Sequence, residues 1–310
     1  MTKLMKELAE LPKGFSQPTA LPVTADQQQG WQHANRDWWE SHPMRYDWKD
    51  GIPYEEFSKE FYIEIDKRFF DAVELYAPCN KIPFDWLIDF AALQTKDVLE
   101  AGVGNGSHAQ LLATHAKSFN GIDLTEYAVK STSERMRVFG LSANVQQMDA
   151  EQMLFPDNTF DFVWSWGVIH HSANTRKILE EMHRVLKPGG EAIVMVYHRT
   201  FWEYYVQGAM LAILSGQAFK PAALHNSIQR RTDGAMARYY KSSEWRQLVS
   251  DLFAVKEIRV YGKKTELVPL PAGKLKDRLV ESIPNTFSRF LTNKCRWGSF
   301  LVSTLVKGAG

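Results

Sequence analysis

The sequence predicts an α/β fold in which a doubly wound, mostly parallel sheet carries helices on both faces. Three features predict it: short apolar strands alternate with helices from residue 96 onwards, a glycine-rich loop follows the first of these strands, and the next two strands each end at an acidic residue. The 310 residues are long for one compact domain and short for two large ones. We therefore expect one core domain with added segments.

The elements of the core follow from apolar runs and turn residues. Apolar runs predict strands at 97–100, 119–123, 144–148, 160–165 and 192–197, and helical spacing predicts helices at 107–116, 125–139 and 175–186. The last helix should stop at Lys187–Gly190, because proline cannot continue a helix and the glycines turn the chain.

The segment before the core is expected to form a cap. Thr2–Leu11 fits a short helix, Pro12–Gly30 fits a mobile arm, and Trp38–Trp48 is the densest aromatic stretch. Residues 55–76 fit a long amphipathic helix, because apolar side chains recur every four residues. That stripe comprises Phe57, Phe61, Ile65, Phe69 and Val73.

The segment after the core has a looser pattern. We expect helices at 201–216 and 242–252, a strand at 253–261, helical pieces at 274–291 that break at Pro284, and a final strand at 298–306. The expected domain plan is an N-terminal arm and cap or lid at 1–94, the core at 95–200, a helical insertion at 201–240 that forms the substrate region, and the rest of the core at 241–310 with an insertion at 263–296.

Composition narrows the class of protein. Hydrophobic residues make up 45% of the chain and charged residues 24%, which excludes a mainly disordered, collagen-like or coiled-coil protein. Cys79 and Cys295 cannot form a disulfide framework, so a reducing compartment fits. The charged start shows no secretory signal, and the apolar stretch at 204–219 is too short to span a membrane. We therefore expect a cytoplasmic protein without a transmembrane segment.

Charge is distributed unevenly along the chain. The net charge is −8 over residues 1–200 and +9 over residues 201–310. Either the two parts attract each other and solvate the surface, or the C-terminal third meets an anionic substrate or surface. The very apolar helix at 201–216 is either buried or in contact with lipid, so peripheral membrane contact stays open.

A glycine-rich loop, Glu100–Gly106, joins the first strand to the first helix of the core. Glycines are needed where backbone approaches a ligand closely, and this edge of an α/β sheet is where such folds bind ligands. The third glycine comes one residue too early for a dinucleotide fingerprint, which disfavours a NAD enzyme. Asp123 and Asp149 end the next two strands, where they can accept ribose hydroxyls and an exocyclic amino group.

With these motifs the chain resembles the class I S-adenosylmethionine-dependent methyltransferases, in their small-molecule branch. The matching stretches are 98–106, 121–124, 149–151, 155–163 and 181–190. The resemblance implies a Rossmann-like, seven-stranded sheet whose last strand is antiparallel, and S-adenosylmethionine as the cofactor. The cofactor-binding residues that it implies are Glu100, Gly102, Gly104, Gly106, Asp123, Leu124, Asp149, Ala150, Ser165 and Trp166.

Methyl transfer needs an aligned nucleophile and often a base that removes its proton. His170 and His171 follow the fourth strand, and either could be that base; at most one should face the substrate, since adjacent residues do not share a face. The pair lacks the spacing of a metal site, so no metal is expected. Tyr197 and His198 end the fifth strand, where they bind substrate or pack in the core.

The aromatic stretch before the core is a candidate lid. In the family an N-terminal helical region often closes over cofactor and substrate, and the exclusion of water protects the reaction. Trp39 and Tyr46 could stack on the substrate or on the cofactor's sulfonium. The alternative is that these aromatic residues only pack the N-terminal helices onto the sheet.

The predicted function is transfer of a methyl group from S-adenosylmethionine to O or N of a small molecule, of lipophilic or anionic character, in biosynthesis. The alternatives are a C-methyltransferase that acts on a quinone or lipid, and a non-catalytic S-adenosylmethionine-binding subunit. A nucleic-acid enzyme is disfavoured, because the fourth strand lacks the Asn/Asp-Pro-Pro-Tyr/Phe motif and no basic stripe with aromatic residues occurs. The chain is expected to be a monomer or a homodimer.

Overall fold

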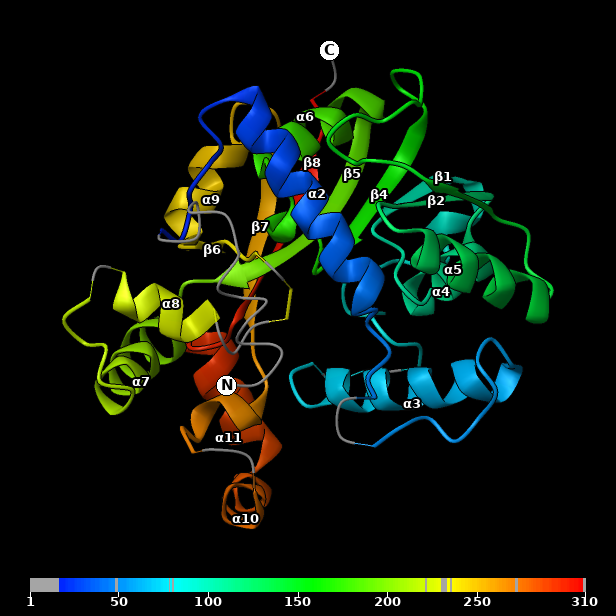
Figure 1. Cartoon of the computed structure of the whole chain (residues 1–310). Coiled ribbons are helices and arrows are strands. Elements are labelled where there is room, and N and C mark those ends of the chain that lie inside the picture. Colours follow the sequence, from blue (N-terminus) through cyan, green and yellow to red (C-terminus); the bar gives the residue numbers. More distant parts are fainter. Residues whose placement is uncertain are drawn as a thin grey trace.

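The structure is a computed structural model that describes residues 17–47, 50–77, 79, 81–220, 222–229, 233–234, 236–270 and 273–308. Its centre is one sheet with the strand order β3-β2-β1-β4-β5-β8-β7, and a short β6 pairs with the end of β5 (Figure 1). The strands are β1 Asp97–Ala101, β2 Ser118–Asp123, β3 Asn144–Gln147, β4 Phe160–Trp166, β5 Leu186–His198, β6 Tyr239–Tyr240, β7 Ala254–Tyr261 and β8 Phe300–Val306.

The direction of the strands confirms the predicted fold class. Neighbouring strands from β3 through β5 pair in parallel, and β8 runs antiparallel between β5 and β7. The antiparallel final strand is therefore confirmed. The two-residue β6 was not predicted, because a pair of tyrosines between two loops carries no strand periodicity.

Helices cover both faces of the sheet. They are α2 Ala25–Ser41, α3 Lys59–Glu74, α4 Ser107–His115, α5 Glu126–Val138, α6 Thr175–Val185, α7 Gly208–Leu214, α8 Ala223–Gln229, α9 Ser242–Val249, α10 Lys274–Ser282 and α11 Asn285–Arg289. π-Helical turns, η5 Phe201–Gln207 and η7 Phe290–Lys294, adjoin α7 and α11, and a 3-10 turn, η6, spans Lys264–Leu267. Among the described residues, no helix is long and apolar enough to span a membrane.

Alternating side chains along the strands build two cores, one on each face. Leu99 and Val163 point to the face that α6 and α9 cover, where Trp245 is fully buried. Val98 and Trp164 point to the opposite face, which α3, α4 and the segment 84–93 cover. The carboxyl ends of the parallel strands are thereby held rigidly at one edge of the sheet.

Three expectations about local structure need correction. The arm expected at 12–30 is helical from Ala25, because the Thr24 hydroxyl accepts from the Gln27 amide and caps α2. The long helix begins at Lys59 rather than at residue 55, since Ser58 caps it, although its stripe from Phe61 onwards is buried as predicted. The expected turn at 187–190 lies inside β5, where an irregularity in the pairing with β4 absorbs it. Thr2–Leu11 and Trp48 lie outside the described residues.

Candidate active site

The carboxyl ends of β1, β2 and β3 meet at one cavity of about 480 Å³. Twelve residues that the sequence singled out line it: Trp39, Tyr46, Gly102, Gly104, Gly106, Asp123, Leu124, Asp149, Ala150, Trp166, His171 and Tyr197. We call the part around the glycine loop, Asp123 and Asp149 the loop end. The part walled by Glu203, Gln207, Lys263, Glu266 and Lys276 is the insertion end.

The glycine loop leaves room for a ligand. Gly102, Gly104 and Gly106 have φ angles of +87°, +53° and +80°, which L side chains rarely adopt. A Cβ on Gly102 would overlap the Val168 side chain, and one on Gly106 would crowd Thr132. A Cβ on Gly104 would meet nothing within 4 Å. Glycine is therefore required by close packing at Gly102 and Gly106, whereas at Gly104 it leaves open space in the cavity.

Asp123 ties β2 to the loop. Its Oδ2 accepts from the backbone N–H of Gly104 at 3.1 Å, and its Oδ1 accepts from the N–H and hydroxyl of Thr125 at 3.0 and 2.9 Å. Burial raises the pKa of this carboxyl, while the hydrogen bonds oppose that shift. The carboxylate therefore fixes the loop and also lines the cavity.

The buried Glu100 carboxylate tests whether the site fits a cationic ligand. It ends β1 with no exposed surface, and neither oxygen has a hydrogen-bond partner among the described residues. Its oxygen lies 3.6 Å from Nδ1 of His108, which lines the cavity. Burial raises the pKa of Glu100 well above its usual range and lowers that of His108 to about 3. A positively charged ammonium group at this end of the cavity would favour the ionised form of Glu100, which burial alone disfavours.

Helix α2 runs diagonally in front of the sheet in Figure 1, and its Gln32, Asn35 and Trp39 line the cavity. Gln32 donates to Asp149 Oδ1 at 2.8 Å and accepts from the N–H of Ala173 at 3.0 Å. At the other end of α2, the Glu40 carboxylate accepts from the N–H groups of Glu126 and Tyr127 at 2.8 and 3.1 Å. The helix thus bridges the site at two points.

The two histidines occupy different positions. His171 lines the cavity, and its ring lies 5.2 Å from Trp39. Its Nδ1 is bonded to the Met236 carbonyl; a carbonyl only accepts, so Nδ1 carries the proton and Nε2 keeps its lone pair. Burial lowers the pKa of His171 to about 4. His170 is fully buried and lies outside the cavity wall, and neither of its ring nitrogens has a hydrogen-bond partner among the described residues.

Four sequence-predicted residues lie away from the cavity wall: Glu100, Ser165, His170 and His198. The buried Ser165 hydroxyl donates to the Ala101 carbonyl at 2.9 Å and so joins β4 to β1. His198 is bonded through Nδ1 to the Gly298 carbonyl at 2.9 Å. Neither side chain faces a ligand, and both hold strands together.

The sequence did not reveal the residues of the insertion end. Glu203 comes from η5, Lys263 precedes η6, Glu266 lies within η6, and Lys276 comes from α10. Glu266 is held by the backbone N–H of Lys263 at 2.9 Å and by the hydroxyl of Ser299 at 2.8 Å. No motif links these scattered positions, so only the fold brings them together. His108 and Gln32 were also missed, although each lies one or two helical turns from a residue that was named.

Comparison with known proteins identifies the core. Residues 99–194 match the family described as "Methyltransferase domain". The chain is 26% identical over 136 residues to the ubiquinone biosynthesis O-methyltransferase of Pseudomonas paraeruginosa, over 43% of this chain and 59% of that protein. It is 37% identical over 97 residues to the phthiotriol/phenolphthiotriol dimycocerosates methyltransferase of Mycobacterium tuberculosis, over 31% of this chain and 35% of that protein.

The fold also matches solved structures. The (4+2)-cyclase SpnF aligns with a TM-score of 0.50 and 14% identity, over 95% of this chain and 100% of that chain. At this identity the match supports the fold alone. The core of the chain is a class I S-adenosylmethionine-dependent methyltransferase domain, and this class uses S-adenosylmethionine as its cofactor. The chain spans about three-fifths of the length of the ubiquinone relative and about a third of the other.

Proposed function

We propose that this protein transfers the methyl group of S-adenosylmethionine to an oxygen or nitrogen atom of a lipophilic small molecule. One observation carries the proposal: the glycine loop, Asp123 and Asp149 converge from three strands on a cavity that continues to His171 and to the insertion end. A donor bound at the loop end therefore shares one cavity with an acceptor bound beyond it.

The donor site is assigned residue by residue. Gly104 gives the open space for the methionine portion, and Glu100 would supply negative charge behind His108 once the donor's amino group favours its ionised form. Asp123 would hold the ribose hydroxyls, and Asp149 with the Ala150 backbone would read the adenine beneath Gln32. The bound donor supplies a methyl group on a positively charged sulfur. Trp166, which lines the cavity, offers an aromatic face to that charge.

His171 is the proposed base. Its Nε2 lone pair can take the proton of an acceptor hydroxyl or amine while that oxygen or nitrogen attacks the methyl carbon and the methyl–sulfur bond breaks, which leaves S-adenosylhomocysteine. Because burial lowers its pKa to about 4, the ring is neutral at physiological pH and its Nε2 lone pair carries no proton. Tyr197 and Trp39 flank His171 and would hold the acceptor against it.

The lining of the cavity supports a lipophilic, ring-bearing acceptor. Aromatic side chains from several elements face it: Trp39, Tyr46, Phe69, Tyr76, Trp166, Tyr197, Tyr239 and Phe300. The two relatives are named for ubiquinone biosynthesis and for phthiotriol dimycocerosates, and both names describe lipid chemistry.

Calorimetric titration with S-adenosylmethionine, S-adenosylhomocysteine and NAD in parallel tests the donor site. We expect both sulfur ligands to bind and NAD not to bind. Labelled donor is then incubated with phenols, amines and quinols of increasing chain length, and label in an O- or N-methyl product supports the proposal. Label on carbon would establish the C-methyltransferase alternative. Donor binding without transfer to any acceptor would favour the non-catalytic subunit.

A further inference from the structure

Exposed apolar side chains are concentrated in one part of this molecule. Among the described residues, thirteen large hydrophobic side chains are exposed, and eight of them lie between residues 201 and 298. These eight are Phe201, Ile213, Leu214, Phe219, Leu275, Leu279, Phe287 and Phe290. Scattered apolar side chains need no explanation, but such a concentration on two inserted segments does.

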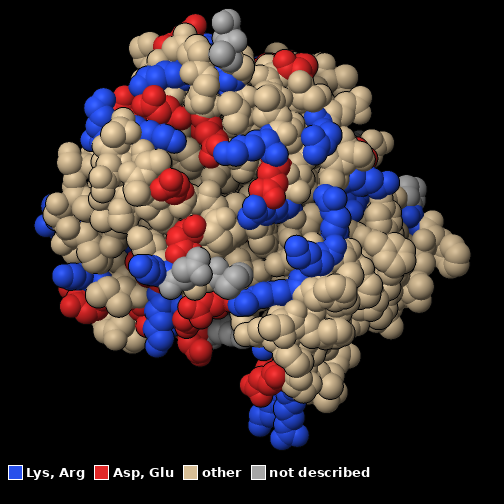
Figure 2. Space-filling model, turned by 180° about the vertical axis from the view of Figure 1, so that it is seen from behind, with Lys and Arg blue, Asp and Glu red and all other residues tan. Residues whose placement is uncertain are grey.

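The first segment forms a lobe without charge. Helices α7 and α8 project from the sheet at the lower left of Figure 1, and no charged residue occurs from Tyr204 to Phe219. In Figure 2, which shows the molecule from behind, this lobe lies at the right as an almost wholly uncharged bulge, bordered by a row of Lys and Arg. Phe219 is fully exposed and Leu214 is 76% exposed. Residue 220, which follows at once, is an exposed lysine.

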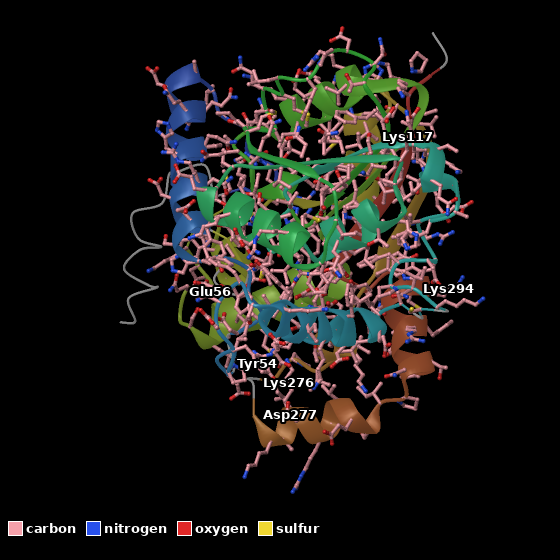
Figure 3. The ribbon with its side chains drawn as sticks, turned by 90° about the vertical axis from the view of Figure 1, so that its right-hand side faces the viewer. Tyr54, Glu56, Lys117, Lys276, Asp277 and Lys294 are labelled. Carbon is pink, nitrogen blue, oxygen red and sulfur yellow. The ribbon has the colours of Figure 1, made fainter. Side chains whose placement is uncertain are left out.

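The second segment is helix α10, the outermost element at the same end of the molecule (Figure 3). Its inner side carries the buried Val280 and also Lys276, which lines the cavity and lies between α10 and α3 in Figure 3. Helical spacing places Lys274, Leu275 and Arg278 on the opposite, outward side. Asp277 lies on one flank and the exposed Glu281 borders the outward side beside Arg278, so this side presents two cations and Leu275 with one carboxylate at its edge.

The basic groups on this surface are not neutralised by neighbours. In the described part of the chain, neither Lys220, Lys274 nor Arg278 forms an ion pair with a carboxylate. Exposed apolar side chains interleaved with unpaired cations match the chemistry of an anionic lipid surface, in which apolar groups enter the acyl boundary and cations meet the headgroups. A second copy of this chain would bring the same positive charges together and is disfavoured.

We propose that the surface made by Ile213, Leu214, Phe219, Lys274, Leu275 and Arg278 docks this protein on an anionic phospholipid bilayer. This inference goes beyond the proposed function and does not rest on it, because no donor or acceptor takes part in the contact. It gives the insertion end of the cavity a position beside the bilayer, since α10 contributes Lys276 to the cavity and Lys274, Leu275 and Arg278 to the surface.

Co-flotation with vesicles tests the proposal. We expect the full chain to float with vesicles of equal parts phosphatidylcholine and phosphatidylglycerol, to float poorly with phosphatidylcholine alone, and to be released by high salt. The pair Leu214→Ser and Phe219→Ser should weaken binding roughly tenfold or more, because two apolar side chains no longer enter the lipid. The pair Lys274→Gln and Arg278→Gln should weaken binding roughly tenfold on anionic vesicles only.

Matched control variants distinguish binding through this surface from nonspecific hydrophobic binding to vesicles. Val23 and Leu154 are 88% and 78% exposed outside the surface, so Val23→Ser with Leu154→Ser should leave flotation unchanged. Melting temperature and S-adenosylmethionine affinity, measured on every variant, show that the fold is intact. The proposal is overturned if the wild-type chain floats with neither vesicle, or if the controls lose binding equally. It is also overturned if sedimentation shows that Leu214→Ser and Phe219→Ser only dissociate a dimer.

Discussion

The loop end and the insertion end of the cavity are built in different ways. At the loop end, Asp123 is the last residue of β2, and Gly104 and Asp149 follow shortly after the ends of β1 and β3, so the parallel sheet positions all three. At the insertion end, Glu203, Lys263 and Lys276 come from short helices and turns that pack mainly against one another. A ligand common to the whole family suits the first arrangement, and a ligand particular to this protein suits the second. The difference explains why sequence motifs reveal one end and not the other.

The largest expected effect falls between the two ends, at His171. Its replacement by alanine should lower kcat by roughly a hundredfold or more, because a positioned base is lost, while S-adenosylmethionine affinity stays near normal. Steady-state kinetics with calorimetry measures both. His198 is the matched control: it is also buried and bonded to a carbonyl, but it does not line the cavity. Equal kcat losses in His171→Ala and His198→Ala would show a structural effect only.

Asp123→Ala tests the loop end. We expect donor affinity to fall by about 1–3 kcal/mol, because hydrogen bonds to the ligand are lost and the Gly104 amide loses its acceptor. Acceptor KM, measured at saturating donor, should hardly change if the two ends bind independently. Unchanged donor affinity in calorimetry would contradict the ribose assignment.

Acid should destabilise the insertion through its own buried histidine. Burial lowers the pKa of His225 in α8 to about 4, below the ordinary 6.5 of an unfolded chain. Between these two pKa values the unfolded chain binds more protons than the folded one. The free energy of unfolding therefore falls as the pH drops below 6.5, by about 2 kcal/mol at pH 5. Hydrogen exchange, corrected for intrinsic rates, should show protection of 201–229 dropping between pH 7 and 5. His225→Phe should remove that pH dependence.

The smallest expected effect distinguishes the two reasons for a glycine at position 104, backbone strain and space for a ligand. Gly104 and Gly140 have φ angles of +53° and +67°, and a Cβ at either position would meet nothing within 4 Å. Alanine at each should cost a similar 1–2 kcal/mol, about the strain of an L-residue in this conformation. Only Gly104→Ala should also weaken donor binding, by roughly tenfold, because only Gly104 lines the cavity. Equal donor affinity in both variants would mean that the loop does not approach the ligand.

Much of the sheet could be predicted because, in this part of the chain, the apolar runs and turn residues of the sequence coincide with the strands and turns of the fold. The strands at 97–100 and 160–165 are apolar runs that end at turns, and both appear with boundaries shifted by one residue. The start of α2 was missed, since Gln-rich sequence at 25–30 carries no apolar periodicity and only the Thr24 cap announces the helix. The hydrogen bond from Gln32 to Asp149 could not be predicted from the sequence, because the two residues are 117 positions apart and no motif links them.

The histidine pair shows the same limit at finer scale. Spacing alone indicated that one of two neighbours faces the site, and the structure separates them: His171 on the cavity wall, His170 in the core. The deciding contact is the Met236 carbonyl, which lies on a loop that no motif marks. The roles assigned to both histidines remain predictions.

The position of β8 has a consequence for synthesis on the ribosome. β8 lies between β5 and β7, so β7 has no neighbour in the sheet until residues 300–306 have emerged. Until then the edge of β5 is open along most of its length, and open edges invite association between nascent chains. The strands that carry the glycine loop can assemble early, whereas the insertion end of the cavity forms only after the C-terminal residues have been synthesised. The loop end of the cavity therefore forms before the insertion end.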